Sequence, residues 1–121
     1  MANDITFYNR SGQAIAWLSA IDNETIYSFD GKPLAYIYDN CVYSFKGVQL
    51  GWYEKGWIFD LEGYCVFCTK NAIGGPIKPV CGISPVKSIK KVKPIKGVRA
   101  IKRVKRLMNL SWVNDYQSFF K

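Results

Sequence analysis

Residues 26–37 read Ile-Tyr-Ser-Phe-Asp-Gly-Lys-Pro-Leu-Ala-Tyr-Ile, and the same pattern recurs along the chain. Residues 42–53, sixteen positions later, read Val-Tyr-Ser-Phe-Lys-Gly-Val-Gln-Leu-Gly-Trp-Tyr. Residues 58–69 repeat it as Ile-Phe-Asp-Leu-Glu-Gly-Tyr-Cys-Val-Phe-Cys-Thr, and residues 7–18 form a looser copy. Because self-similarity at a fixed period is the signature of a repeat architecture, we expect four copies of one structural unit.

Each copy predicts two short strands joined by a two-residue turn that ends in glycine. The turn pairs are Ser11-Gly12, Asp30-Gly31, Lys46-Gly47 and Glu62-Gly63. Glycine adopts the positive φ of a tight hairpin turn without steric cost, and the flanking Tyr, Phe, Trp, Val and Ile favour strands. Residues 1–76 are therefore expected to form an all-β domain of four β-hairpin repeats of about 16 residues in a pseudo-four-fold arrangement.

Two columns of residues line up when the copies are superimposed. One holds Trp17, Tyr36, Trp52 and Cys68, and its neighbour holds Ala16, Ala35, Gly51 and Phe67. Strand alternation puts the columns on opposite faces, with the small residues near the axis. Phe67 breaks the pattern, so the fourth unit is expected to fit differently or to plug the centre. We interpret the aromatic column as core; the alternative is a stacking platform for a base or sugar ring.

Composition sets the class of protein. The 121 residues include 19 aromatic ones, enough to bury a core in one small domain. No run of eighteen apolar residues is present, and the first residues lack a signal-peptide pattern. We expect a cytoplasmic protein with no membrane partner.

Charge divides the chain into two parts. Residues 1–76 carry five Lys/Arg and eight Asp/Glu, a net charge of −3. Residues 77–121 carry twelve Lys/Arg and one acidic residue, a net charge of +11. The overall net charge of +8 therefore belongs to the C-terminal third.

In residues 77–109 the apolar residues recur at every third position, which fits neither the α-helical nor the strand period. They are Ile77, Val80, Ile83, Val86, Ile89, Val92, Ile95, Val98, Ile101, Val104 and Leu107. A period of three fits polyproline II, so we predict an extended, polyproline-II-like tail docked on the repeats. Disordered segments are poor in such residues, so this apolar stripe is expected to be buried on the repeat domain, on a second chain or on the tail itself.

A second stripe, of cations, follows the apolar one at the next position. Its candidate binding residues are Lys87, Lys90, Lys93, Lys96, Arg99, Lys102 and Lys105. One interpretation is a solvated edge that keeps the protein soluble and complements the acidic repeats. The alternative is contact with a polyanion such as DNA or RNA. No known nucleic-acid motif accompanies the stripe, which argues against base-specific recognition.

The reactive side chains offer little for catalysis or metal binding. The four cysteines are Cys41, Cys65, Cys68 and Cys81, and there is no histidine. Cys65 and Cys68 fall in a predicted strand, where residues three apart point to opposite faces, so we expect free thiols and no metal site. Most carboxylates lie on or beside predicted turns; Asp60 is the exception. The sequence predicts no enzyme, no catalytic residue and no cofactor.

Residues 110–121 predict a short C-terminal helix. Trp112, Tyr116, Phe119 and Phe120 fall at helical spacing, and Ser111 or Asn114 is a candidate cap. We expect this segment to dock on the repeats; a partner-binding peptide is the alternative.

The Ser-Phe-Asp-Gly-Lys-Pro-Leu-Ala-Tyr-Ile repeat, a Val-Lys-x-Ile-Lys tail and a Leu-Ser-Trp sequence near the C-terminus together resemble the four-fold β-flower proteins, a family of small bacterial proteins. The resemblance spans nearly the whole chain and implies four hairpins arranged as petals. It carries over no catalytic residue. We expect a non-enzymatic structural or binding module of unknown ligand, whose tail fixes the repeat ring or mediates self-association. The alternative is polyanion binding through the cation stripe.

Overall fold

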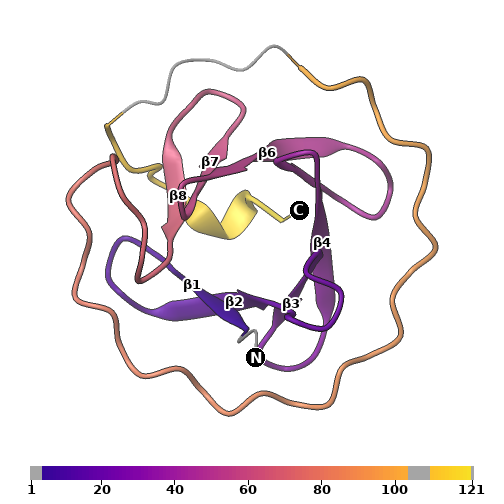
Figure 1. Ribbon diagram of the computed structural model, residues 1–121, viewed down its shortest axis with the longest axis horizontal. Coiled ribbons are helices and arrows are strands. Elements are labelled where there is room, and N and C mark those ends of the chain that lie inside the picture. Colours follow the sequence, from indigo (N-terminus) through magenta and orange to yellow (C-terminus); the bar gives the residue numbers. More distant parts are fainter. Residues whose placement is uncertain (1–3, 104–109, 121) are drawn as a thin grey trace.

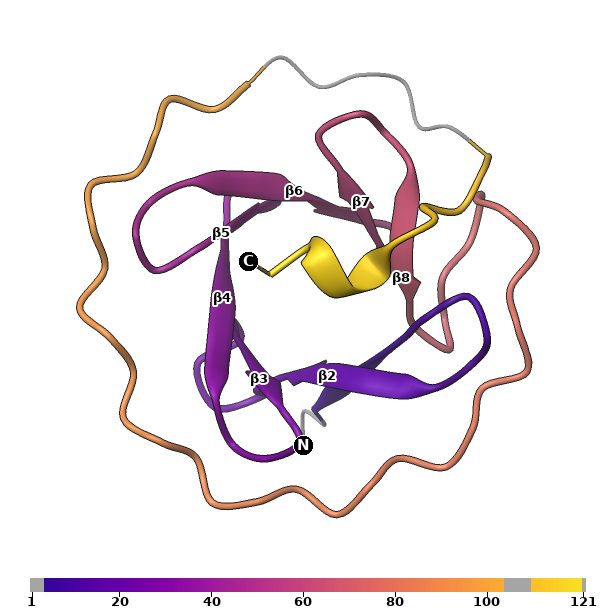
Figure 2. The same cartoon turned by 180° about the vertical axis from the view of Figure 1, so that it is seen from behind.

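The computed structural model of the chain describes residues 4–103 and 110–120. In these residues eight antiparallel strands form a closed barrel in chain order, and the last strand pairs back to the first. The strands are β1 (Ile5–Tyr8), β2 (Ala14–Leu18), β3 (Thr25–Ser28), β4 (Pro33–Tyr38), β5 (Cys41–Tyr43), β6 (Gln49–Glu54), β7 (Trp57–Asp60) and β8 (Cys65–Cys68). Figure 1 shows them as hairpins set around a centre, and Figure 2 shows the same ring from behind. The predicted all-β fold of repeated hairpins is confirmed.

The hairpins turn through three-residue loops, so the prediction of two-residue turns is wrong. In the first hairpin the Asn9 N–H donates to the Gln13 carbonyl at 3.0 Å, and the Gly12 N–H donates to the Asn9 carbonyl at 3.0 Å. The φ of Gly12 is +83°. This is a type I turn followed by a glycine bulge, a common three-residue hairpin loop. The same two bonds recur in the other hairpins, which begin their loops at Ser28, Ser44 and Asp60.

Two-residue turns lie instead between the hairpins. Asp39 and Asn40 have φ values of 51° and 61°, and Lys55 and Gly56 have 53° and 83°. Positive φ at both central residues is what a type I′ turn requires. The link between the first two hairpins, around Ser19 to Glu24, is longer.

A β-bulge inside each hairpin changes which side chains share a face. In the fourth hairpin Cys65 pairs with Phe59 while Phe67 pairs with the residue before it, so Val66 is an extra residue. One extra residue shifts the alternation of the strand. The prediction that Cys65 and Cys68 point to opposite faces is therefore wrong, because both thiols lie in one buried cluster.

The core has two parts, as the two columns predict. The axial cluster includes Ala16, Ala35 and Phe67 together with apolar residues of the partner strands. The aromatic cluster includes Tyr36, Trp52 and Cys68. The aromatic column therefore serves as core.

The C-terminal segment crosses the centre of the ring in both views (Figures 1 and 2). Its helix is a single 3-10 turn, Tyr116–Ser118, and the Asp115 carboxylate caps it by accepting from the Gln117 N–H. The prediction that Ser111 or Asn114 caps the helix is wrong, because the N-cap is Asp115. The Ser111 backbone carbonyl accepts from the Cys65 N–H at 3.0 Å.

Phe67 explains why this segment docks on the axis. Its ring is fully buried and stacks on Phe120 at 5.6 Å between centroids, with Phe119 edge-on at 6.0 Å. Fully burying one such ring is worth about 1.5–3 kcal/mol. The large residue that breaks the small column therefore supports the C-terminal plug.

Residues 77–103 carry no helix or strand and run around the outside of the ring (Figures 1 and 2). Backbone hydrogen bonds fix this tail to three hairpin loops at intervals of nine residues. The donor–acceptor pairs are Gly82–Gly12 (2.8 Å), Lys91–Gly31 (2.9 Å) and Ala100–Gly47 (2.8 Å). A Cβ on any of these loop glycines would lie 2.0–2.1 Å from a tail carbonyl oxygen, so glycine also permits the close approach of the tail.

Candidate functional site

The side of the tail that faces the ring carries the cation stripe. Lys87 pairs with Asp4 at 2.7 Å, Lys93 with Asp22 at 3.2 Å, and Lys102 with Asp39 at 3.2 Å. Lys96 pairs with Glu24. The acidic partners come from the start of the chain and from the links between hairpins. The stripe therefore complements the acidic repeats, which is the first of the two interpretations above.

Aromatic rings of the repeats receive the same cations. The Lys87 ammonium lies 4.6 Å from the Trp17 ring centroid, and the Lys96 ammonium lies 4.4 Å from that of Tyr36. The Arg99 guanidinium lies 3.6 Å from the centroid of Tyr38. Such contacts are favourable because the face of an aromatic ring carries partial negative charge.

Lys90 has the most enclosed position in the stripe. Its ammonium donates to the Ser19 hydroxyl at 2.9 Å and lies 5.2 Å from the Tyr27 ring and 5.4 Å from the Trp17 ring. Of the seven candidate residues, Lys105 lies outside the described residues. The structure brings the other six to the inner side of the tail.

The pKa values of the paired groups reflect these contacts. Burial alone would raise the pKa of Asp22, but hydrogen bonds from Thr25, Glu24 and Lys93 lower it well below its usual range. The hydrogen bond to Asp22 raises the pKa of Lys93, and the bond to Asp39 raises that of Lys102. The side chains of the paired lysines remain 34–46% exposed, so solvent and salt screen these pairs and each contributes little to stability.

The opposite side of the tail carries the apolar stripe, which points to solvent. Its described members are 92–97% exposed: Ile77, Val80, Ile83, Val86, Ile89, Val92, Ile95, Val98 and Ile101. The expectation that these residues are buried on the repeat domain or on the tail itself is therefore wrong. The physical reason is that the outer rim of the repeats offers carboxylates and aromatic faces, which attract the cations and turn the other side outward. We call this outward surface the Ile/Val belt; Val104 and Leu107 lie outside the described residues.

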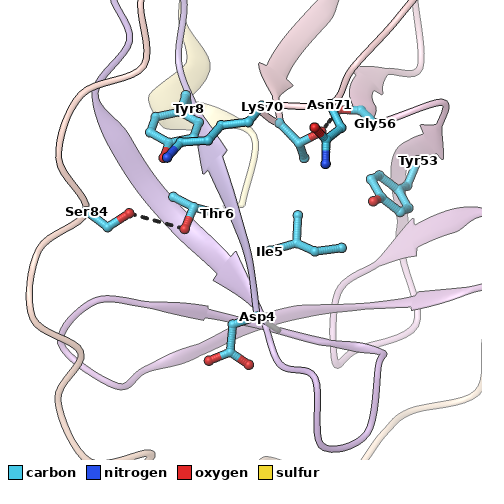
Figure 3. A pocket seen from close by; sticks show the side chains of 10 residues that line it. Asp4, Ile5, Thr6, Tyr8, Tyr53, Gly56, Lys70, Asn71 and Ser84 are labelled. Carbon is cyan, nitrogen blue, oxygen red and sulfur yellow. Dashed lines mark hydrogen bonds between the residues drawn. The ribbon is translucent and has the colours of Figure 1, made fainter. Parts of the chain in front are cut away.

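A pocket of about 520 Å³ lies at the seam between the first and last hairpins (Figure 3). Tyr8, Tyr53, Lys70 and Asn71 are among its lining residues, and the Thr6 and Ser84 hydroxyls lie 3.2 Å apart at its tail side. Desolvation raises the pKa of Tyr53. The lining mixes polar and apolar groups without a nucleophile held by a base.

None of the four cysteines forms a disulfide in the structure. Cys41, Cys65 and Cys68 are buried and Cys81, on the tail, is partly exposed. Burial raises the pKa of Cys65 to about 12 and that of Cys68 to about 11. Among the residues that the structure describes, no three His, Cys, Asp or Glu side chains are arranged to hold a metal ion.

Asp60, the carboxylate that the sequence left unexplained, closes a hairpin loop. Its Oδ1 accepts from the Glu62 and Tyr64 N–H groups, both at 3.0 Å. Asn9 does the same in the first hairpin, accepting from Ser11 and Gln13. Its position in the structure is therefore that of a turn residue.

Sequence reasoning missed the individual acids that hold the tail, Asp4, Asp22, Glu24 and Asp39. The signal that points to them is the division of charge, −3 against +11, between two segments of one chain. That signal predicts mutual attraction but not which residues pair.

Comparison with models of protein families matches residues 5–120 to the model described as 4-fold beta flower protein. Comparisons with curated proteins and with solved structures found no match. In the described ranges, no helix has the length and apolar character needed to cross a membrane.

Proposed function

The chain belongs to the 4-fold beta flower protein family, and we propose that it is a non-enzymatic structural and binding module whose tail fixes the repeat ring and presents the Ile/Val belt for self-association. The observation that carries the proposal is the orientation of the tail. Its cations meet the acids and aromatic rings of the repeats, while its aliphatic side chains face outward.

The inward side supports a fixing role because its contacts are many, weak and distributed. Backbone hydrogen bonds at nine-residue intervals tie the tail to successive loops, and ion pairs and cation–π contacts lie between them. Each backbone bond contributes about 0.5–1.5 kcal/mol net. The uncharged bonds would survive salt that screens the ion pairs. Residues three positions apart point to the same side of the tail, which also supports a polyproline II conformation.

The outward side supports binding of a second copy of the chain. Soluble monomers rarely expose contiguous apolar patches above a few hundred Å². At about 25 cal/mol per Å² and about 1.5–3 kcal/mol per side chain, each Ile or Val offers about 60–120 Å². Three or four on one arc give about 200–500 Å², less than the roughly 800 Å² per partner of a stable interface. We therefore propose weak association through one arc, with further copies on other arcs.

The cysteines support a proposal for the cell compartment. We propose a cytoplasmic location, in a bacterial cell as the resemblance implies, because cysteines without disulfides are typical of that compartment.

The experiment that tests the fixing role is limited trypsin digestion with mass spectrometry, at low and high salt, with and without mixed-sequence DNA. Lysine or arginine at nearly every third position makes a loose tail an easy substrate. We expect protection of the tail at both salt concentrations without DNA. A tail that is cut freely alone and protected only by DNA at low salt would favour polyanion binding, with a log–log salt slope of about −5 for six phosphate contacts.

The experiment that tests self-association is sedimentation velocity over a range of protein concentrations. Wild type is compared with the variant Val86→Thr/Ile89→Thr/Val92→Thr, which alters one arc of the belt and leaves the cation stripe intact. We expect wild type to associate more as concentration rises, and the variant to associate less. Equal, concentration-independent sedimentation of both proteins as monomers would refute the binding role.

A further inference from the structure

The seam that closes the ring is the place where the tail and the repeats each carry a cysteine. The strands β1 and β8 pair in the structure through Tyr8 and Cys68, whereas every other neighbouring pair of strands shares at least three paired positions. Cys81 of the tail packs against the buried cluster that contains Cys68, and it lies near enough to contribute to the raised pKa of the Cys68 thiol. Cys68 of the ring and Cys81 of the tail therefore lie in the same region, where strands β1 and β8 close the barrel.

The nine-residue spacing of the tail shows which residues stand at the equivalent of Cys81 along the other hairpins. Lys90 stands nine residues after Cys81, and Arg99 stands nine residues after Lys90. Lys90 faces the cross-strand pair Trp17 and Tyr27. Residues at this nine-residue spacing in the tail therefore face successive members of the aromatic column, beginning with Trp17 for Lys90.

Arg99 continues the pattern on the next hairpin. Its guanidinium lies over the ring of Tyr38, and the neighbouring Tyr36, whose cross-strand partner is Tyr43, raises the pKa of Arg99. At the seam the corresponding cross-strand pair is Cys68 and Tyr8. At the seam, Cys81 therefore takes the tail position that a cation holds elsewhere, and Cys68 takes the position of the aromatic residue in the ring.

We propose that Cys68 and Cys81 form a disulfide under oxidising conditions, and that this covalent bond locks the tail to the ring at its closing seam. The oxidant is a low-molecular-weight disulfide such as oxidised glutathione.

The chemistry proceeds by two thiol–disulfide exchanges. The Cys81 thiol is the accessible one; it loses its proton and attacks one sulfur of the oxidant, whose S–S bond breaks to release one small thiol. The Cys68 thiol then loses its proton and attacks Sγ of Cys81, which releases the second small thiol. Two protein thiols are oxidised to one disulfide and one small disulfide is reduced to two thiols.

The order of attack follows from burial. Cys68 is fully buried, and desolvation raises its pKa, so few Cys68 thiolates exist at neutral pH. Its attack is favoured because Cys81 packs against the same buried cluster. Cys41 and Cys65 are also buried in the ring. A disulfide from Cys81 to either of them instead of Cys68 is the competing outcome that the test must separate.

The test is tryptic mapping of the full-length protein after incubation with oxidised glutathione, with free thiols blocked and no reductant. Trypsin cleaves after Lys55, Lys70 and Lys87 but not between Lys78 and Pro79. Peptide 56–70 therefore carries Cys65 and Cys68, and peptide 71–87 carries Cys81. We expect the two peptides to be joined, with fragmentation placing the bond at Cys68, and the intact protein to lose two hydrogens in mass.

Two matched variants separate the outcomes. Cys65→Ser retains the joined peptides if the bond is to Cys68, whereas Cys81→Ser, at a partly exposed position, cannot form them and remains folded. Closing a loop of about 15 residues predicts a rise of roughly 10 °C in the unfolding midpoint of oxidised wild type, absent in Cys81→Ser. A bond between Cys65 and Cys68, a stable mixed disulfide at Cys81, or no oxidation would each overturn the proposal.

Discussion

Replacing Gly31 with alanine is expected to detach the tail from the second hairpin. The φ of Gly31 is +89°, and an added Cβ would lie 2.1 Å from the Ile89 carbonyl oxygen. That separation is far below van der Waals contact, and both atoms belong to or are attached to backbone, so the tail must move. Gly74 provides the matched control, because its φ is +74° and nothing lies within 4 Å of its added Cβ.

The magnitude follows from two contributions. A positive φ costs alanine about 1–2 kcal/mol, and this cost applies to both variants. Displacing the tail also breaks the bonds from Lys91 N–H to Gly31 and from Ser88 N–H to Phe29, both 2.9 Å. At about 0.5–1.5 kcal/mol each, their loss adds about 1–3 kcal/mol. We expect Gly31→Ala to lower the free energy of unfolding by about 2–5 kcal/mol, and Gly74→Ala by about 1–2 kcal/mol.

The assay is urea unfolding combined with timed trypsin digestion. In Gly31→Ala, cleavage after Lys90 and Lys91 should accelerate, whereas Gly74→Ala should keep the wild-type pattern of protection. Equal losses of stability in the two variants, with unchanged cleavage at Lys90 and Lys91, would refute the conclusion that the tail rests on this loop.

Three other predictions concern the charges, the plug and the loops. The Asp22 pKa is lowered on folding, so its stabilising contribution is present above the unfolded pKa near 4 and is lost as pH falls below it. In urea unfolding, the stability difference between wild type and Asp22→Asn should therefore be smaller at pH 3 than at pH 7. A constant difference would contradict this. Phe67→Ala should lower the free energy of unfolding by about 3–5 kcal/mol and expose the C-terminal segment to carboxypeptidase, since the ring supports the plug; wild-type resistance to the peptidase would contradict that support. Asp60→Asn should be nearly neutral because Asn9 fills the equivalent place, whereas Asp60→Ala should cost about 1–2 kcal/mol in thermal or urea unfolding; equal stability of the two variants would show that the loop bonds contribute nothing.

The repeated hairpins and the two faces of the core were predictable because each rests on a local signal repeated in every copy. Gly12 and Gly31 mark loops that need positive φ, and Ala16 and Trp17 mark opposite faces of one strand. The exception at Phe67 also carried information, since a large residue in a small column does fill the centre.

What the sequence did not predict depends on register and on contacts between distant segments. The bulge at Val66 moves Cys65 and Cys68 to one face of the strand. A prediction that assumes strict alternation of side chains between the two faces cannot include this extra residue. The triplet period defines two stripes on the tail, but the inward side is decided by acids such as Asp22, more than seventy positions away from Lys93.

The spacing of nine makes the tail commensurate with the ring. Gly12 and Gly31 are nineteen residues apart and Gly31 and Gly47 sixteen, yet the tail advances by nine in both steps, about 28 Å of polyproline II. Inserting one residue in the tail would turn the apolar side chains beyond it toward the ring and move the cations off the inward position. Inserting three would keep the sides but move every backbone donor away from its loop. Only insertions or deletions of nine preserve both, so a relative with one more petal would need nine more tail residues, and the length of the tail counts the petals.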